Sequence, residues 1–230
     1  MKKLIIKKDR TIELEKVEKP GGINIVIQPG VKGNLIFRGG LEEAIVTVMR
    51  GAVFNLFCLM TDLDSDDSKI VINLIEPLAQ AHVHGIFHGQ QEDKHFFNII
   101  MHHQAKETKG DIIIKGVYEN MSRGSFSGLI KIDKASQKAV SHFSDEILLS
   151  DEAIALSVPT LEISANDVRA SHRSTTSQID EEQLFYLASR GLNQQQARQM
   201  IIKGFFKSIT DKLPVNIKNK FYAQTAGAEY

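Results

Sequence analysis

Residues 159–206 read PTLEISANDVRASHRSTTSQIDEEQLFYLASRGLNQQQARQMIIKGFF, two capped helices that follow directly on a strand-like run. Asp180 is a favourable N-cap with Gln183 three residues later, and Gly191 is a favourable left-handed stop for the first helix. Asn193 and Gln196 repeat the capping-box spacing at once. Two helices joined by so few residues are expected to pack as a hairpin.

The second helix has more apolar residues than a single buried stripe needs. The residues spaced for its inner face are Ala197, Met200, Ile201 and Phe205. Ile202 and Phe206 fall outside that stripe, with Lys203 beside them, and an outer apolar pair near lysines is typical of an interface. The sequence therefore predicts a partner-binding surface, with Phe206 as its exposed member, formed by Ile202, Lys203, Phe205 and Phe206.

The composition excludes several function classes. Among 230 residues, 28 basic and 28 acidic side chains leave a formal charge of zero, so no attraction to nucleic acid or an acidic membrane is expected. The start, MKKLIIKKDR, has only three consecutive apolar residues, too few for a signal peptide or a membrane helix. A cytoplasmic protein is expected. The single cysteine, Cys58, excludes an internal disulfide framework.

Short strands dominate the chain up to about residue 171. Ile23, Ile25 and Ile27 alternate with other residues, and glycines interrupt such runs repeatedly. This pattern predicts a β domain over residues 1–171, either a sandwich, a barrel or a parallel β-helix, followed by a helical subdomain over 172–230. No strict repeat period selects one of the three.

Histidines are the other candidates for chemistry. His82, His84 and His88 would share one side of a strand, an arrangement similar to a cupin metal site, although the expected glutamate is missing. An exposed polar face on a β wall is the competing interpretation. His103 is expected to bond to a turn.

A longer series of residues resembles the C-terminal core of the SufB/SufD family of iron–sulfur cluster assembly proteins. Over roughly the last 135 to 140 residues, the matching residues are His103, Thr108, Lys115-Gly116-Val117, Phe126-Ser127-Gly128, Leu148-Leu149-Ser150-Asp151, Pro159, Leu161-Glu162-Ile163, Asp167-Val168-Arg169-Ala170-Ser171-His172, Asp180, Leu184-Phe185-Tyr186-Leu187, Ser189-Arg190-Gly191, Ala197 and Gly204-Phe205. The first 80 residues match poorly.

This resemblance implies a fold and partners. It implies a mainly β protein, a right-handed parallel β-helix followed by a small C-terminal helical subdomain. It also implies pairing through the end of the β-helix, here residues 147–172, as a homodimer or a heterodimer with a related chain. The chain has no glycine-rich nucleotide-binding loop, so no nucleotide is expected to bind here. The family's ATPase partner, SufC, would instead dock within residues 192–213.

The resemblance also makes His172 a candidate metal ligand. The matching histidine of the SufD branch is implicated in cluster formation, and a neutral imidazole can replace a thiolate on iron. The competing interpretation is a histidine that orders the corner between strand and helix. This chain has Arg173 where relatives have an acidic residue or a glycine, and a cation there is expected to repel iron.

The sequence thus favours a non-catalytic scaffold subunit, one that holds a transient iron–sulfur cluster and is driven by a SufC-type ATPase. Two alternatives stay open. One is a cupin-like metal-dependent enzyme using His82, His84 and His88, and the other is a purely structural β-helix module.

Overall fold

A computed structural model describes residues 1–14, 22–39, 42–61 and 66–225 of the chain. Fourteen strands precede three helices in the described residues. The strands are β1 Lys2–Ile6, β2 Arg10–Leu14, β3 Ile23–Ile27, β4 Lys32–Arg38, β5 Glu43–Val48, β6 Val53–Met60, β7 Asp66–Leu74, β8 Gln80–Gly89, β9 Lys94–His103, β10 Lys109–Tyr118, β11 Arg123–Ile132, β12 Val140–Leu149, β13 Ile154–Ile163 and β14 Arg169–Gln178. The helices are α1 Glu181–Ser189, α2 Gln194–Thr210 and α3 Val215–Thr225.

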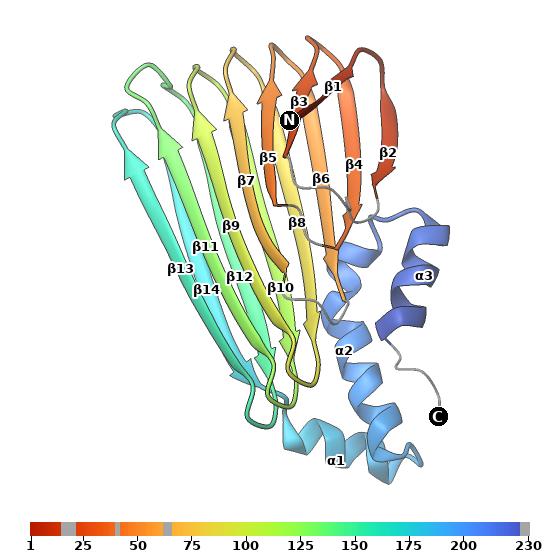
Figure 1. The fold of residues 1–230 in the computed structure, drawn as a ribbon. Coiled ribbons are helices and arrows are strands. Elements are labelled where there is room, and N and C mark those ends of the chain that lie inside the picture. Colours follow the sequence, from red (N-terminus) through yellow and green to blue (C-terminus); the bar gives the residue numbers. More distant parts are fainter. Residues whose placement is uncertain (15–21, 40–41, 62–65, 226–230) are drawn as a thin grey trace.

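The strands form a parallel β-solenoid, which confirms the expected mainly β fold. Odd-numbered strands make one seven-stranded sheet and even-numbered strands make the other, so the chain crosses from sheet to sheet at every turn (Figure 1). All pairs of neighbouring strands are parallel. Because parallel strands need crossovers, neither face of the arrangement can be made from simple hairpins.

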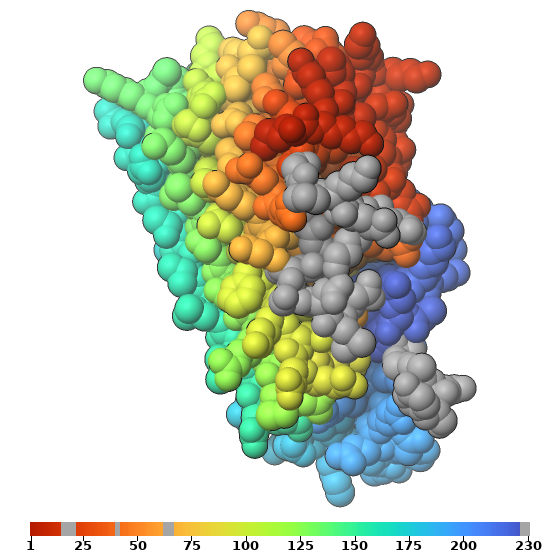
Figure 2. Space-filling view, in the orientation of Figure 1, coloured from red at the N-terminus to blue at the C-terminus, as the bar shows by residue number. Residues whose placement is uncertain are grey.

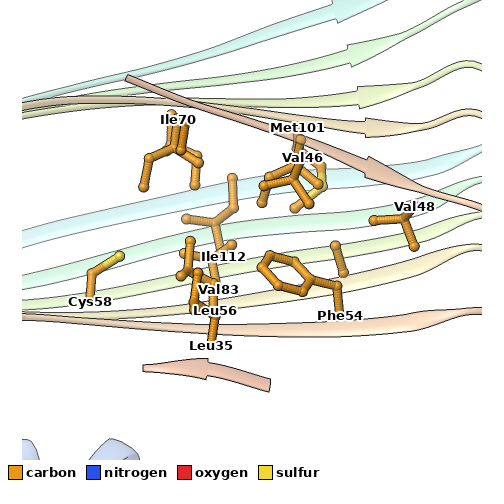
Figure 3. Close-up of a cluster of buried hydrophobic side chains, with 14 of the residues drawn as sticks. Leu35, Val46, Val48, Phe54, Leu56, Cys58, Ile70, Val83, Met101 and Ile112 are labelled. Atoms are coloured by element: carbon orange, nitrogen blue, oxygen red, sulfur yellow. The ribbon is translucent and has the colours of Figure 1, made fainter. Parts of the chain in front are cut away.

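The space between the two sheets is filled by stacked apolar side chains. Leu35, Leu56, Val83 and Ile112 occupy the same register position in successive even-numbered strands and lie above one another (Figure 3). All four are at most 1% exposed. Alternate residues of each strand point inward, so every coil buries its apolar residues on those of the next coil.

Coil length varies along the solenoid. Paired residues are 21 positions apart between β4 and β6, 29 between β8 and β10, and 31 between β10 and β12. A repeat that lengthens in this way leaves no fixed period in the sequence, which is why periodicity alone left the sandwich and the barrel open.

The helices begin where their capping residues predict. The Asp180 carboxylate accepts a hydrogen bond from the backbone N–H of Glu182 at 2.9 Å, and Asn193 and Gln196 form a reciprocal capping box. Gly191 follows α1 with a φ of 93°, the left-handed conformation expected for its stop. Strand β14 continues to Gln178, and α1 begins at Glu181, directly after its predicted N-cap.

Helix α2 packs on the outer face of the even-numbered sheet, contrary to the predicted orientation of its faces. Phe206 is fully buried and Ile202 is 6% exposed, and they lie in a second apolar cluster between α2, α3 and the sheet. The sheet contributes Ile36, Phe57, Leu59, Ile86 and Val117 to that cluster. The prediction that Ile202 and Phe206 are exposed was therefore wrong, because the solenoid wall itself is their partner.

Candidate functional site

The last coil of the solenoid ends both sheets and exposes an apolar row on one of its two strands. Strand β13 is the final strand of the odd-numbered sheet and β14 is the final strand of the even-numbered one. On β13, Ile154, Leu156 and Val158 are 55%, 58% and 47% exposed. Figure 2 shows β13 along one margin of the molecule. Edge strands with exposed apolar residues favour addition of another chain.

His172 lies on β14 within this last coil. It is exposed and pairs in register with Phe143, a buried residue of the inner row, so His172 continues that row at the end of the solenoid. Two positions further along, Ser174 donates a hydrogen bond to the Asp145 carboxylate at 2.8 Å. Burial raises the pKa of Asp145 above its ordinary value. The His172 imidazole of β14 and the Asp145 carboxylate of β12 thus both lie on the inward-facing side of their strands at the end of the solenoid.

Arg173 does not share that side. Alternation along β14 directs it to the outer face, where its guanidinium forms an ion pair with Glu146. Lys115 also pairs with Glu146, at 3.0 Å. The expectation that Arg173 would repel iron at His172 loses its basis, since the charge lies on the opposite face and is compensated.

The three histidines of β8 share its outer face, as the strand pattern predicts, yet they have separate surroundings. The His82 Nδ1 atom is 2.9 Å from an Asp111 oxygen, and the His88 Nε2 atom is 2.9 Å from a Glu119 oxygen. His84 lies between them against the ring of Phe57, with 5.0 Å between ring centroids. No cluster of three or more metal-ligating side chains occurs in the described part of the chain. A parallel solenoid also differs from the cupin architecture, so the cupin-like alternative gains no support.

Glu119 connects the solenoid wall to helix α2. Its side chain is nearly buried, and Arg198 of α2 donates a hydrogen bond to the second Glu119 oxygen at 2.9 Å. Burial alone would raise the pKa of Glu119, but the hydrogen bond from His88 and the charge of Arg198 hold it below its ordinary value. A buried charge that is paired on both oxygens fixes the position of the helix against the sheet. This group of residues was missed from the sequence.

His103 has the turn-bonded role that the sequence suggested. Its Nδ1 atom is 2.8 Å from the Thr108 hydroxyl oxygen, and that hydroxyl donates to the carbonyl of Ala105 in the same turn. The ring is fully buried. Burial, together with the nearby His102, lowers the pKa of His103 to about 4.

Of the predicted partner-binding residues, Lys203 and Phe205 remain accessible. Lys203 is exposed, and Phe205 is half-buried with the Lys115 ammonium 4.4 Å from its ring centroid. Phe205 also borders a groove of about 600 Å³. The groove lies between α1, α2 and the end of β14, and its apolar lining comprises Leu148, Ile179, Ile201 and Phe205. No helix of the described residues is long and apolar enough to span a membrane.

Comparison with known proteins identifies a shared domain. Residues 41–205 match the family model described as "SUF system FeS cluster assembly, SufBD core domain". An iron–sulfur cluster assembly SufBD family protein of Synechocystis is 35% identical over 116 residues, which are 50% of this chain and 24% of that protein. A chloroplastic SufBD family protein of Arabidopsis thaliana is 33% identical over 115 residues, 50% of this chain and 21% of that protein.

A third relative extends the same observation to another group of bacteria. A SufBD family protein of Mycobacterium tuberculosis is 34% identical over 116 residues, 50% of this chain and 14% of that protein. The matched region therefore spans less than a quarter of the length of each of these relatives.

Proposed function

The chain belongs to the SufBD family of iron–sulfur cluster assembly proteins, and on that premise we propose that it is a non-catalytic subunit of a cluster-assembly scaffold. Two copies, or this chain and a relative, pair through the last coil and hold a transient iron–sulfur cluster as cargo. A SufC-type ATPase drives the complex. The observation that carries the proposal is the final coil of the solenoid, where β13 carries an exposed apolar row and β14 carries His172.

Pairing follows from the chemistry of that end. Ile154, Leu156 and Val158 are each about half exposed along one edge strand, and apolar rows of this kind are rarely left in water. A second chain that covers β13 and β14 would remove the apolar row from solvent. It would also provide hydrogen-bond partners for the backbone groups of both edge strands. The covering chain can be identical or a relative, since either would present a similar edge.

Cluster binding then requires both chains. His172 and Asp145 lie on the inward-facing sides of the neighbouring strands β14 and β12, but the described residues contain no group of three metal-ligating side chains. Imidazole nitrogen and carboxylate oxygen both bind iron, and a complete site usually takes about four ligands. A partner chain at this end would supply the remaining ligands, so His172 acts as one ligand of a shared site.

Docking of the ATPase uses the accessible side of α2. Phe205 is half-buried at the mouth of the 600 Å³ groove, and Lys203 is exposed two residues earlier, on another side of the same helix. Aromatic residues at the rim of a groove commonly dominate binding energy. Ile202 and Phe206 have no part in this contact, because they are buried against the solenoid.

Replacing Phe205 with alanine should weaken binding to a SufC-type ATPase by about tenfold or more, because the partner loses its aromatic anchor. The measurement is calorimetric titration of the purified ATPase. Phe96→Ala is the matched control, since Phe96 is 46% exposed on β9 of the other sheet, and its affinity should stay within about twofold. If both variants bind the ATPase with equal affinity, the ATPase does not dock on this helix through Phe205.

Replacing Leu156 with glutamate should separate the pair, because a charge in the apolar row cannot be buried unpaired. Sedimentation should then give a mass near the 25.7 kDa monomer, and anaerobic reconstitution should leave little iron. His172→Ala should keep the dimer and lose iron. Met121→Glu, an exposed site on the β10–β11 turn, is the control and should keep both. A wild-type monomer at micromolar concentration would contradict self-pairing, and full iron loading of His172→Ala would contradict the role of His172 as a ligand.

A further inference from the structure

A second groove lies on the outer face of the even-numbered sheet, beneath the turn that joins α2 to α3. Its volume is about 850 Å³, within the usual range for small-molecule sites. We call it the outer groove. Its floor includes Asn55, His82, His84 and Asp111, and Lys212 and Leu213 overhang it from the turn. It is separate from the last coil and from the groove beside Phe205.

The floor of the outer groove is a row of polar side chains at one register position. Asn34, Asn55, His82, Asp111 and His142 follow one another across neighbouring strands. The Asn55 amide donates to Asn34 at 2.7 Å, His82 lies 2.9 Å from Asp111, and His142 lies 2.8 Å from Ser171. These contacts fix the side chains before any ligand arrives, which lowers the entropic cost of binding.

His84 is the member of the floor whose hydrogen bonding is incomplete. It is 6% exposed, it lines the outer groove, and its Nδ1 atom has no hydrogen-bond partner among the described residues. Buried polar atoms are nearly always paired, so this ring is the residue of the groove floor with unused hydrogen-bonding capacity. Burial, then the charges of Lys212 and His82, lowers the pKa of His84 to about 4, so the ring is neutral at neutral pH.

The charges that line the outer groove favour an anion. Lys32 and Lys212 both line it and are exposed, and no ion pair engages the Lys212 ammonium within the described residues. Asp111 is the one carboxylate among the described lining residues, and it is already hydrogen-bonded to His82. Cations without local partners in a concave site attract negative groups.

Apolar side chains complete the outer groove on the side of His84. Phe57 lies against the His84 ring, and Ile36, Leu213 and Pro214 line the same region. Small-molecule sites typically combine an apolar surface with a few fixed polar groups that orient the ligand. A bare inorganic ion would leave this apolar surface unused, whereas an organic anion would contact both parts.

We propose that the outer groove binds a small organic anion, with its carboxylate or phosphate at Lys212 and His84 and its apolar body against Phe57 and Leu213. The ammonium of Lys212 pairs with the anionic oxygens. The Nδ1–H of the neutral His84 ring is enclosed by protein, and it reaches one of these oxygens after a rotation of the ring. Phosphate and carboxylate present the same acceptor chemistry to these donors, so the experiment distinguishes them. This inference is independent of the scaffold role.

Phenyl phosphate, benzoate and inorganic phosphate are the probes, titrated into the full chain labelled at histidine. We expect saturable NMR shifts of the His84 ring with phenyl phosphate or benzoate at about millimolar Kd or below, and weaker binding of inorganic phosphate. The better of the two organic probes identifies the charged group. Lys212→Gln should weaken its binding roughly tenfold. Lys134→Gln, which makes the same change at an exposed lysine outside the groove, should leave the Kd within about twofold.

Several results would overturn the proposal. The first is that neither organic probe gives a saturable shift of the His84 ring up to about 20 mM. The second is that Lys212→Gln binds the probe with unchanged affinity. The third is that inorganic phosphate binds as tightly as phenyl phosphate. Lys212 is exposed, so its substitution should not disturb folding. A His84→Leu variant adds a second measurement where it folds, and it should lose binding by a similar factor.

Discussion

Replacing Phe206 with alanine should lower the free energy of unfolding by about 3 to 5 kcal/mol, the usual range for deleting a fully buried aromatic ring. Phe206 is 0% exposed between α2, α3 and the outer face of the solenoid. Its ring centroid lies 5.5 Å from that of Phe205, 5.7 Å from that of Phe221 and 6.3 Å from that of His88. Removing the ring would leave a cavity that these elements cannot readily close. Urea unfolding measures the change.

Phe185→Ala is the matched control because it deletes the same ring at the surface. Phe185 is 77% exposed on α1, so its loss should change the free energy of unfolding by less than about 0.5 kcal/mol. An unfolding midpoint of Phe206→Ala equal to that of Phe185→Ala would mean that α2 does not pack against the sheet as described. A loss of ATPase binding without a loss of stability would restore Phe206 to the docking surface.

Local signals in the sequence were sufficient to locate the first two helices. Asp180 and Asn193 cap them as their spacing predicts, and Gly191 ends the first with a positive φ. Caps are readable because each depends on residues three or four positions apart. The strand that precedes α1 was harder to delimit, since the run SHRSTTSQ before Ile179 has little apolar alternation and is wholly exposed.

The buried face of α2 could not be assigned from helical periodicity. Ala197 faces α1, whereas Ile202 and Phe206 face the solenoid. The helix therefore buries residues on two different faces rather than along one stripe. Met200, which the periodicity assigned to the inner face, is 50% exposed. A sequence shows how many apolar residues a helix carries, but the neighbouring elements decide which of them are covered.

Contacts between distant residues were equally inaccessible from the sequence. Glu119 and Arg198 are 79 positions apart in the sequence, and no local motif predicts their ion pair. The sequence predicted that the histidines of β8 share one face. It did not show that His82 pairs with Asp111 and His88 with Glu119, because both acidic residues come from the next coil. Register between coils creates the outer groove, and register was unpredictable because the interval between coils changes from 21 to 31 residues.

Acidification from pH 6.5 to pH 4.5 should lower the free energy of unfolding by several kcal/mol, through two buried histidines. Burial is the first cause that lowers the pKa of His84 and of His103 to about 4, from an ordinary value of 6.5. Between these values the unfolded chain binds protons that the folded chain does not, so folding loses stability as the pH falls. One pH unit corresponds to about 1.36 kcal/mol per group, which gives roughly 2 to 3 kcal/mol for each histidine across this window.

His103→Gln should reduce the slope of stability against pH by about half in this window, because one of the two groups no longer titrates on unfolding. His142→Gln is the control, since His142 is exposed and the same substitution there should leave the slope unchanged. Asp145 acts in the opposite direction, because burial raises its pKa and favours the folded state at lower pH. Urea unfolding at half-unit intervals from pH 7 to pH 4.5 tests the prediction. A flat profile for the unsubstituted protein would show that neither ring is held neutral by burial.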